Sequence, residues 1–176
     1  GFAGFEMAPV YHGYSLAPEW LYDMYTPLHR ALWVIDLAEE LDVPVRISAG
    51  IENFRGRSRM DTTENISNDE LLALLSANRN ANVMITDFSP AGINDELCRL
   101  IKERKKTYFD ITQVEGFMIN SVKLAMAKVD ERNFCFGTGL PFRYAETNTV
   151  KLYFSESFSH PGIPAANIKN VFKALR

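Results

Sequence analysis

The sequence is poor in cysteine and nearly balanced in charge. Its two cysteines, Cys98 and Cys135, have no C-x-x-C spacing, which excludes a disulfide scaffold and a zinc ribbon and predicts a reducing, cytoplasmic compartment. Nineteen Lys and Arg residues against 22 Asp and Glu give a net charge of -3, so no nucleic-acid partner is expected. No apolar run reaches the roughly 18 residues of a membrane span, and the first residues lack the basic region of a signal peptide. We therefore expect neither a membrane nor a nucleic acid as partner.

Motifs that identify particular chemistries are also missing. The segment Gly137-Thr138-Gly139 lacks the further glycine of a dinucleotide-binding turn and the lysine of a phosphate-binding loop. No G-x-S-x-G nucleophile elbow, H-E-x-x-H helix, EF-hand loop or H-x-H pair occurs. These absences exclude the standard serine-hydrolase, zinc-protease and calcium-binding sites.

Short apolar runs alternate with helical stripes along the chain. Strands are expected where the apolar runs are short, over residues 2–9, 43–47, 83–86, 107–111 and 134–137. Helices are expected where apolar residues recur at steps of three and four, over residues 28–41, 71–75, 93–101, 118–129 and 168–175. Two of these helices have start signals, the Ser-x-x-Glu box from Ser67 to Glu70 and the capping residue Asn94.

Alternating strands and helices predict right-handed βαβ units and a parallel sheet. A complete eight-unit barrel uses about 31 residues per unit, so this chain holds about five to six units. We predict an α/β fold, with one domain over residues 1–176 and a parallel sheet of about five strands. The sheet is either open and doubly wound or part of a TIM barrel.

In parallel α/β folds the ligand lies beyond the carboxyl ends of the strands, which selects the candidate site residues. His12 follows the first expected strand, where it is either a general base or an ordinary polar loop residue. Asp87 follows the third, where it serves acid–base chemistry or caps the next turn. Thr138 follows the fifth, where it can contact a substrate.

Arginine supplies the candidate anion-binding groups. Arg55 and Arg57 alternate with other residues in the loop after the second expected strand, and they either clamp a carboxylate or phosphate or pair with acidic residues nearby. Arg46 lies within that strand between two apolar residues, pointing into a barrel lumen or under a helix. A charge inside a fold needs a partner, which Asp87 or Asp110 on neighbouring strands can supply.

Several segments together resemble the C-terminal half of the amidohydrolase-related superfamily, whose members are TIM-barrel hydrolases. Residues 4–14, Gly-Phe-Glu-Met-Ala-Pro-Val-Tyr-His-Gly-Tyr, resemble the fourth-strand segment of that family. Residues 38–50 resemble the helix and fifth strand that follow, residues 136–142 the eighth strand, and residues 163–175 the closing helix. The resemblance implies that this chain holds strands four to eight of a barrel. It also implies that the sheet edges are covered, by a missing N-terminal half or by another copy in a homo-oligomer.

At the metal-binding positions the chain departs from the family. Ser48 and Asp87 stand where histidines usually end the fifth and sixth strands. Gly139 stands in place of the aspartate in the eighth-strand Gly-Ser-Asp-x-Pro pattern. The usual divalent metal, which needs such ligands, is therefore not supported by this segment, and no residue is assigned as a metal ligand.

The resemblance implies an amidohydrolase-like enzyme with a non-standard active site, which hydrolyses or decarboxylates a small carboxylate. In this interpretation Asp87 and His12 are the acid and the base, and the anionic substrate is bound by Arg46, Arg55, Arg57 and Thr138. The alternative is a non-catalytic binding or assembly module that has kept the barrel and lost the chemistry. An open nucleotide-binding sheet is the third interpretation, but residues 9–13 make a poor phosphate-binding turn.

Overall fold

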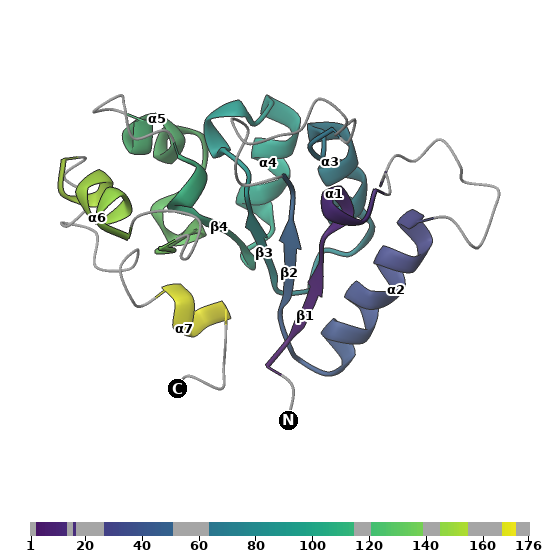
Figure 1. Ribbon diagram of the computed structural model, residues 1–176. Helices are drawn as coiled ribbons and strands as arrows, with labels where there is room; N and C mark the ends of the chain where they lie inside the picture. Colours follow the sequence, from purple (N-terminus) through teal and green to yellow (C-terminus); the bar gives the residue numbers. More distant parts are fainter. Residues whose placement is uncertain are drawn as a thin grey trace.

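The computed structural model describes residues 3–13, 16, 27–50, 64–114, 121–138, 145–154 and 167–171. Within them, strands and helices alternate to form one parallel sheet (Figure 1). Its strands are β1 (Phe5–Met7), β2 (Val45–Ser48), β3 (Val83–Thr86), β4 (Thr107–Asp110) and β5 (Phe134–Cys135). The predicted α/β class is confirmed, with a five-stranded parallel sheet of βα units that does not close into a barrel.

The helices agree with the sequence signals in most places. They are α1 (Pro9–His12), α2 (Pro27–Glu40), α3 (Asn68–Ala77), α4 (Asp95–Glu103), α5 (Ser121–Lys128), α6 (Ala145–Phe154) and α7 (Asn167–Val171). Both start signals are confirmed, since Ser67 and Glu70 form a capping box and the Asn94 side chain accepts the Leu97 N–H at 2.9 Å. The apolar pattern does not predict α1 or α6. Within the described ranges, no helix combines the length and apolarity that a bilayer crossing requires.

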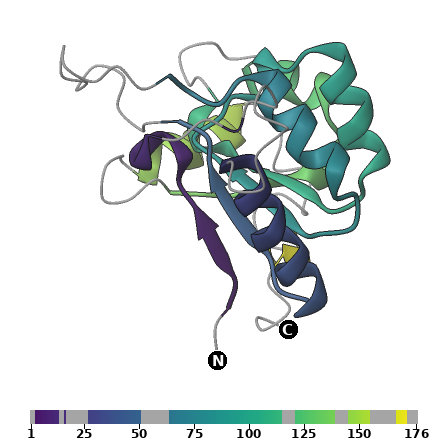
Figure 2. The ribbon, with the colours of Figure 1, turned by 90° about the vertical axis from the view of Figure 1, so that its right-hand side faces the viewer.

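The strands lie in the sheet in the order in which they occur in the chain. Each neighbouring pair is parallel, so right-handed connections place the intervening helices on one face. The packing agrees, because Ile35 of α2, Leu74 of α3, Leu97 of α4 and Val122 of α5 share one buried cluster with Ile85 of β3. At one side of the sheet β1 is the edge strand (Figure 2).

The opposite face of the sheet changes in character from strand to strand. On β3, β4 and β5 it presents Met84, Tyr108 and Cys135, which pack with Val171 of α7. On β2 the register partner of Met84 is Arg46, whose side chain is 44% exposed. This face is therefore apolar where α7 covers it and charged toward β1.

A buried guanidinium joins α3, the turn before β3 and the start of β4. Arg104 donates to Thr107 Oγ1 at 2.9 Å, to the Leu75 carbonyl at 2.8 Å and to the Ala81 carbonyl at 3.0 Å. The Asn78 carbonyl accepts a further hydrogen bond from the same group. Burial lowers the pKa of Arg104 to about 10, because desolvation disfavours the charged form. The hydrogen bonds compensate for much of that cost and fix the amino ends of two strands.

Replacing Arg104 with Met is expected to lower the free energy of unfolding by about 3 kcal/mol or more, because buried carbonyl groups lose their donor. Arg99→Met, at an exposed position on α4, is the matched control. Urea unfolding followed by circular dichroism measures both variants. Equal losses of stability in the two would contradict the role assigned to Arg104.

Candidate acidic site

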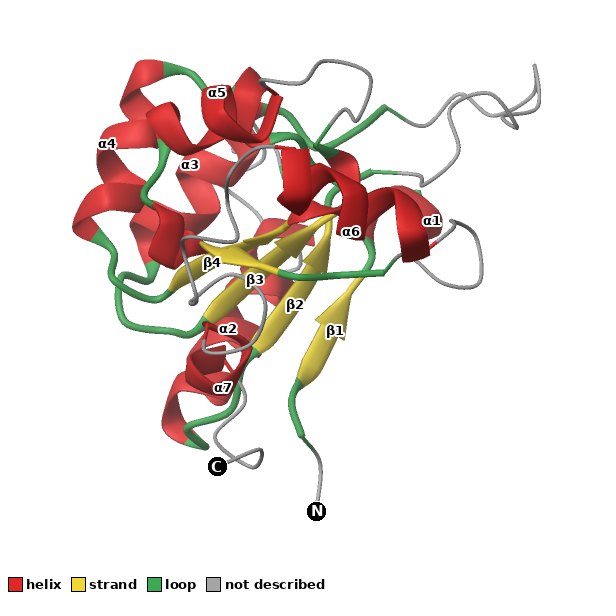
Figure 3. Ribbon diagram, turned by 90° about the vertical axis from the view of Figure 1, so that its left-hand side faces the viewer, coloured by secondary structure: helices red, strands yellow, loops and turns green. Residues whose placement is uncertain are grey.

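Polar side chains gather at the carboxyl edge of the sheet. Ser48 ends β2 and is the register partner of Thr86, which ends β3. Asp87 follows Thr86 directly, and Asp110 ends β4, the next strand. Figure 3 shows this end of the sheet, where the strand arrows point toward α1 and α6. We call these four residues, from three neighbouring strands, the acidic site.

The Asp87 carboxylate is oriented by two hydroxyl groups. Its Oδ2 accepts hydrogen bonds from Ser48 Oγ at 3.0 Å and from Thr86 Oγ1 at 3.2 Å. The backbone of Asp87 has a φ of +58°, in the left-handed region that aspartate tolerates better than most residues. Gly50 packs against it, and a Cβ there would lie 2.6 Å from the Asp87 carbonyl oxygen. Hydroxyl donors and close backbone packing therefore fix the position of this carboxylate.

The Asp110 carboxyl group packs against residues that follow β4 and β5. Its Oδ1 accepts the backbone N–H of Thr112, and Gly137 lies so close that a Cβ at that position would overlap the carboxyl oxygens. Burial raises the pKa of Asp110, and the negative charge of Asp87 raises it further. The hydrogen bonds from Thr112 and the charge of Arg46 oppose this rise. Asp110 therefore keeps its proton to a higher pH than an exposed aspartate does.

Arg46 connects the acidic site to the open face of the sheet. Its Nη1 lies 3.2 Å from Glu6 Oε1 on β1, and its Nε donates to Thr86 Oγ1 at 3.3 Å. Sequence reasoning pointed to Asp87 or Asp110 as the partner of this charge, whereas the structure pairs it with Glu6, its register neighbour. Because Thr86 Oγ1 also donates to Asp87, hydrogen bonds connect the guanidinium to the carboxylate.

Cys135 lies beside the acidic site but is not a nucleophile at neutral pH. Burial raises the pKa of its thiol to about 12, and the charge of Asp110, its register partner, contributes to the rise. The thiolate is the reactive form of cysteine, so this thiol stays unreactive. Cys98 is also free and buried.

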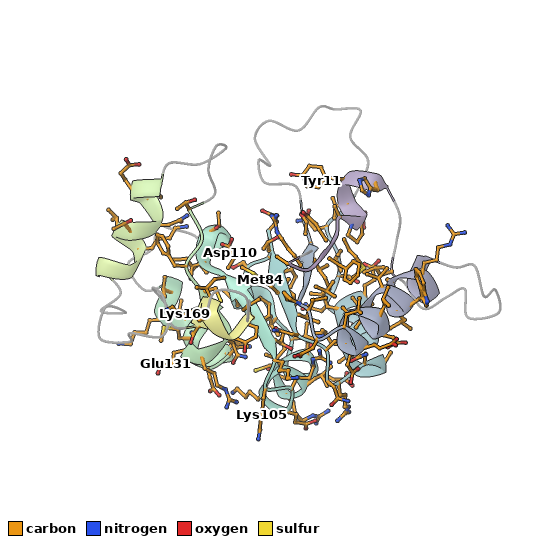
Figure 4. The ribbon with its side chains drawn as sticks, turned by 90° about the horizontal axis from the view of Figure 1, so that it is seen from below. Tyr11, Met84, Lys105, Asp110, Glu131 and Lys169 are labelled. Atoms are coloured by element: carbon orange, nitrogen blue, oxygen red, sulfur yellow. The ribbon has the colours of Figure 1, made fainter. Side chains whose placement is uncertain are left out.

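The structure places His12 on α1, a helix that follows β1 and contacts β2. His12 ends α1 and is exposed, and it follows β1 rather than a strand of the acidic site. Three strand spacings separate β1 from β4, a distance of roughly 14 Å. Figure 4 shows the neighbouring Tyr11 on α1, to one side of Asp110. The role of His12 as an acid or a base therefore stays a prediction.

The remaining predicted site residues are placed only in part. Thr138 follows β5, where its carbonyl accepts a hydrogen bond from Asn148 Nδ2 at 3.0 Å. This contact uses the backbone of Thr138 and leaves its proposed role toward a substrate as a prediction. Arg55 and Arg57 lie outside the described residues.

Sequence reasoning did not select Asp110 as a site residue. It also did not select Lys151, a buried residue of α6. Asp110 fell inside a strand expected to run to residue 111, so its place at the strand end was hidden. The Asp-x-Thr pattern at residues 110–112 is the available signal, because an aspartate side chain often bonds the backbone two residues on. Lys151 had no such signal, because the apolar residues over 145–154 do not recur with a helical period.

The donor groups at this edge do not fit the divalent metal that the family resemblance implies. In the part of the chain that the structure describes, no three His, Cys, Asp or Glu side chains gather closely enough to hold a metal ion. The Asp87 Oδ2 atom already accepts two hydroxyl hydrogen bonds, and its neighbour at the end of β2 is a serine.

Comparisons with models of protein families, with curated proteins and with solved structures found no match to this chain. The function has to be inferred from the geometry of the acidic site and from the segments that resemble amidohydrolase-related barrels.

Replacing Asp110 with Asn is expected to change how stability depends on pH. Because folding raises the pKa of Asp110, its contribution to stability is fully present below the ordinary aspartate pKa of about 3.9 and is lost as pH rises through the folded value. The asparagine side chain cannot ionise, so the free energy of unfolding of the variant should rise relative to the wild type over that range.

Urea unfolding at a series of pH values measures this difference. Asp95→Asn, at an exposed position on α4, shows how the loss of an exposed carboxyl group alters the same pH dependence. A difference between wild type and Asp110→Asn that stays constant with pH would contradict the raised pKa.

Proposed function

We propose that the chain is an amidohydrolase-like enzyme whose acidic site hydrolyses or decarboxylates a small carboxylate. The observation that carries the proposal is a pair of carboxyl groups, Asp87 and Asp110, which follow neighbouring strands and lie in different surroundings. Enzymes that need an acid and a base at one pH use such pairs, because different environments separate the two pKa values. The pair also lies at the carboxyl edge of a parallel sheet, where ligands bind in α/β folds.

Asp87 serves as the base and Asp110 as the acid. The charged Asp87 carboxylate, oriented by its two hydroxyl donors, takes a proton from water as that water attacks the substrate. Asp110 keeps its proton until it gives it to the leaving group. We assign the second role to Asp110 rather than to His12, because Asp110 lies on the strand next to that of Asp87.

Arg46 binds the carboxylate of the substrate. A guanidinium has five N–H donors, and the contacts among the described residues engage the Nε and one Nη1 donor of Arg46. Its side chain is 44% exposed, so donors remain for an anion from solution. Arg55, Arg57 and Thr138 are the further residues that the proposal assigns to binding of the anion. Free thiols at both cysteines support a cytoplasmic location.

Asp87→Asn and Asp110→Asn are each expected to lower kcat by roughly 10²- to 10⁴-fold, the usual contribution of a general acid or base. Turnover is measured on a panel of small N-acyl amino acids, lactones and aromatic carboxylates, with Asp95→Asn as the control. The Asp110→Asn variant should also lose the alkaline limb of the pH profile of kcat/KM, because that limb reports ionisation of the acid. Full turnover by Asp87→Asn would overturn the assignment.

A non-catalytic assembly module is the second candidate function, because the sheet has two edges. In the described part of the chain, β1 pairs only with β2, and β5 pairs only with β4. The other edge of each strand is therefore a template for pairing with another chain. The Phe5 N–H bonds the Pro44 carbonyl on the β2 side. By alternation the N–H of Glu6 points to the open edge.

If a second copy pairs with β1, Glu6→Pro is expected to convert a dimer into a monomer, because proline has no N–H to donate. Glu6→Gln removes the same charge but keeps the N–H, so it is the matched control. Sedimentation velocity distinguishes the two states. A monomeric wild type, or a Glu6→Pro variant that still dimerises, would rule out this edge contact.

A further inference from the structure

Helix α6 buries two polar side chains that bond to residues following β4 and β5. Side chains are described for residues 146–151 of this helix, and the buried ones among them are Asn148, 1% exposed, and Lys151, 8% exposed. Thr149 and Val150, which lie between them in the sequence, are exposed. A surface helix ordinarily buries apolar side chains, whereas the buried side chains among residues 146–151 are polar.

Both buried side chains donate to backbone carbonyl groups beyond the ends of neighbouring strands. Asn148 Nδ2 donates to the carbonyls of Gly137 at 2.8 Å and Thr138 at 3.0 Å, which follow β5. Lys151 Nζ donates to the carbonyl of Thr112 at 2.9 Å, which follows β4, and to Asn148 Oδ1 at 2.8 Å. The two side chains therefore form one bridge between β4 and β5, which we call the α6 clamp.

The α6 clamp holds the two residues that enclose the Asp110 carboxyl group. Thr112 gives its N–H to Asp110 Oδ1, and its carbonyl accepts a hydrogen bond from Lys151. Gly137 packs against the carboxyl group, and its carbonyl accepts a hydrogen bond from Asn148. Each side of the Asp110 carboxyl group is thus fixed by one member of the clamp.

This mode of docking carries a cost that an apolar contact would avoid. Burial of an ammonium group is unfavourable before its hydrogen bonds are counted, whereas a methionine at position 151 would bury apolar surface favourably. Hydrogen bonds to carbonyl groups also require defined distances and angles, which apolar contacts do not. The benefit of the clamp therefore lies in the geometry of the residues that it holds.

We propose that Asn148 and Lys151 are positioning residues of the acidic site, which hold the Asp110 carboxyl group against Gly137 and away from water. The inference rests on the proposed function, in which Asp110 is the acid. When the clamp is released, water reaches this carboxyl group, and its pKa falls toward that of an exposed aspartate.

The test has to leave the other charges around Asp110 unchanged. The groups that act on Asp110 are Asp87 on β3 and Arg46 on β2, with the Cys135 thiol beside it on β5. Lys151 itself adds a positive charge from α6. Asn148→Leu removes the Gly137 side of the clamp and the Asn148 acceptor of Lys151, and it retains all of these charges, so it is the informative substitution. Thr147→Leu, at an exposed position on the same helix, is the matched control.

Carbon-13 NMR of the aspartate carboxyl groups follows the titration, and the signal missing from Asp110→Asn identifies Asp110. We expect a lower midpoint for Asp110 in Asn148→Leu than in the wild type, and an unchanged midpoint in Thr147→Leu. With a substrate in hand, kcat should fall roughly tenfold or more while KM changes little, because the acid is displaced. An unchanged midpoint in folded Asn148→Leu overturns the proposal. If that variant does not fold, Asn148→Ser carries the same test with a smaller side chain.

The titration needs no turnover, so it separates the clamp from the proposed reaction. A lowered midpoint in Asn148→Leu, with no carboxylate turned over by the wild type, supports the clamp and contradicts the reaction. Turnover by the wild type with an unchanged midpoint supports the reaction and contradicts the clamp.

Discussion

Parallel pairing of the strands in chain order is the constraint on which this structure depends. It brings every carboxyl end to one edge, and it makes the residues that follow successive strands neighbours in space. The pairing of Ser48 with Thr86 delivers two hydroxyl groups to Asp87. A register slip of one residue would turn Arg46 into the helix-covered core and expose Ile47. Burial of apolar side chains under α2 to α5 therefore fixes the site as well as the fold.

Local features of this fold could be predicted from the sequence, and features that depend on register or burial could not. The strand Val83–Thr86 is a short apolar run bounded by polar residues, and the caps at Ser67 and Asn94 act within four residues. Asp87 was found because it directly follows a strand. The pairing of Arg46 with Glu6 needs the register of β1 against β2, which no local pattern supplies.

The two ends of the sheet use buried cations for different purposes. At the amino end, Arg104 satisfies backbone carbonyls and joins helix, turn and strand into one unit. At the carboxyl end, Lys151 binds a carbonyl next to a carboxyl group that holds its proton. A left-handed aspartate, Asp87, lies nearby. A buried cation at either end of the sheet thus satisfies backbone carbonyl groups, and at the carboxyl end it does so beside titratable carboxyl groups.

The sequential strand order also determines how the chain can fold while it is being synthesised. Each strand pairs with the strand made just before it, so no pairing has to wait for a more distant segment of the chain. The sheet can grow strand by strand as the ribosome releases it. Helix α6 emerges after β5, and the carbonyl groups that receive its side chains come from β4 and β5. The hydrogen bonds that Asn148 and Lys151 make around Asp110 can therefore form only after both of these strands have been synthesised.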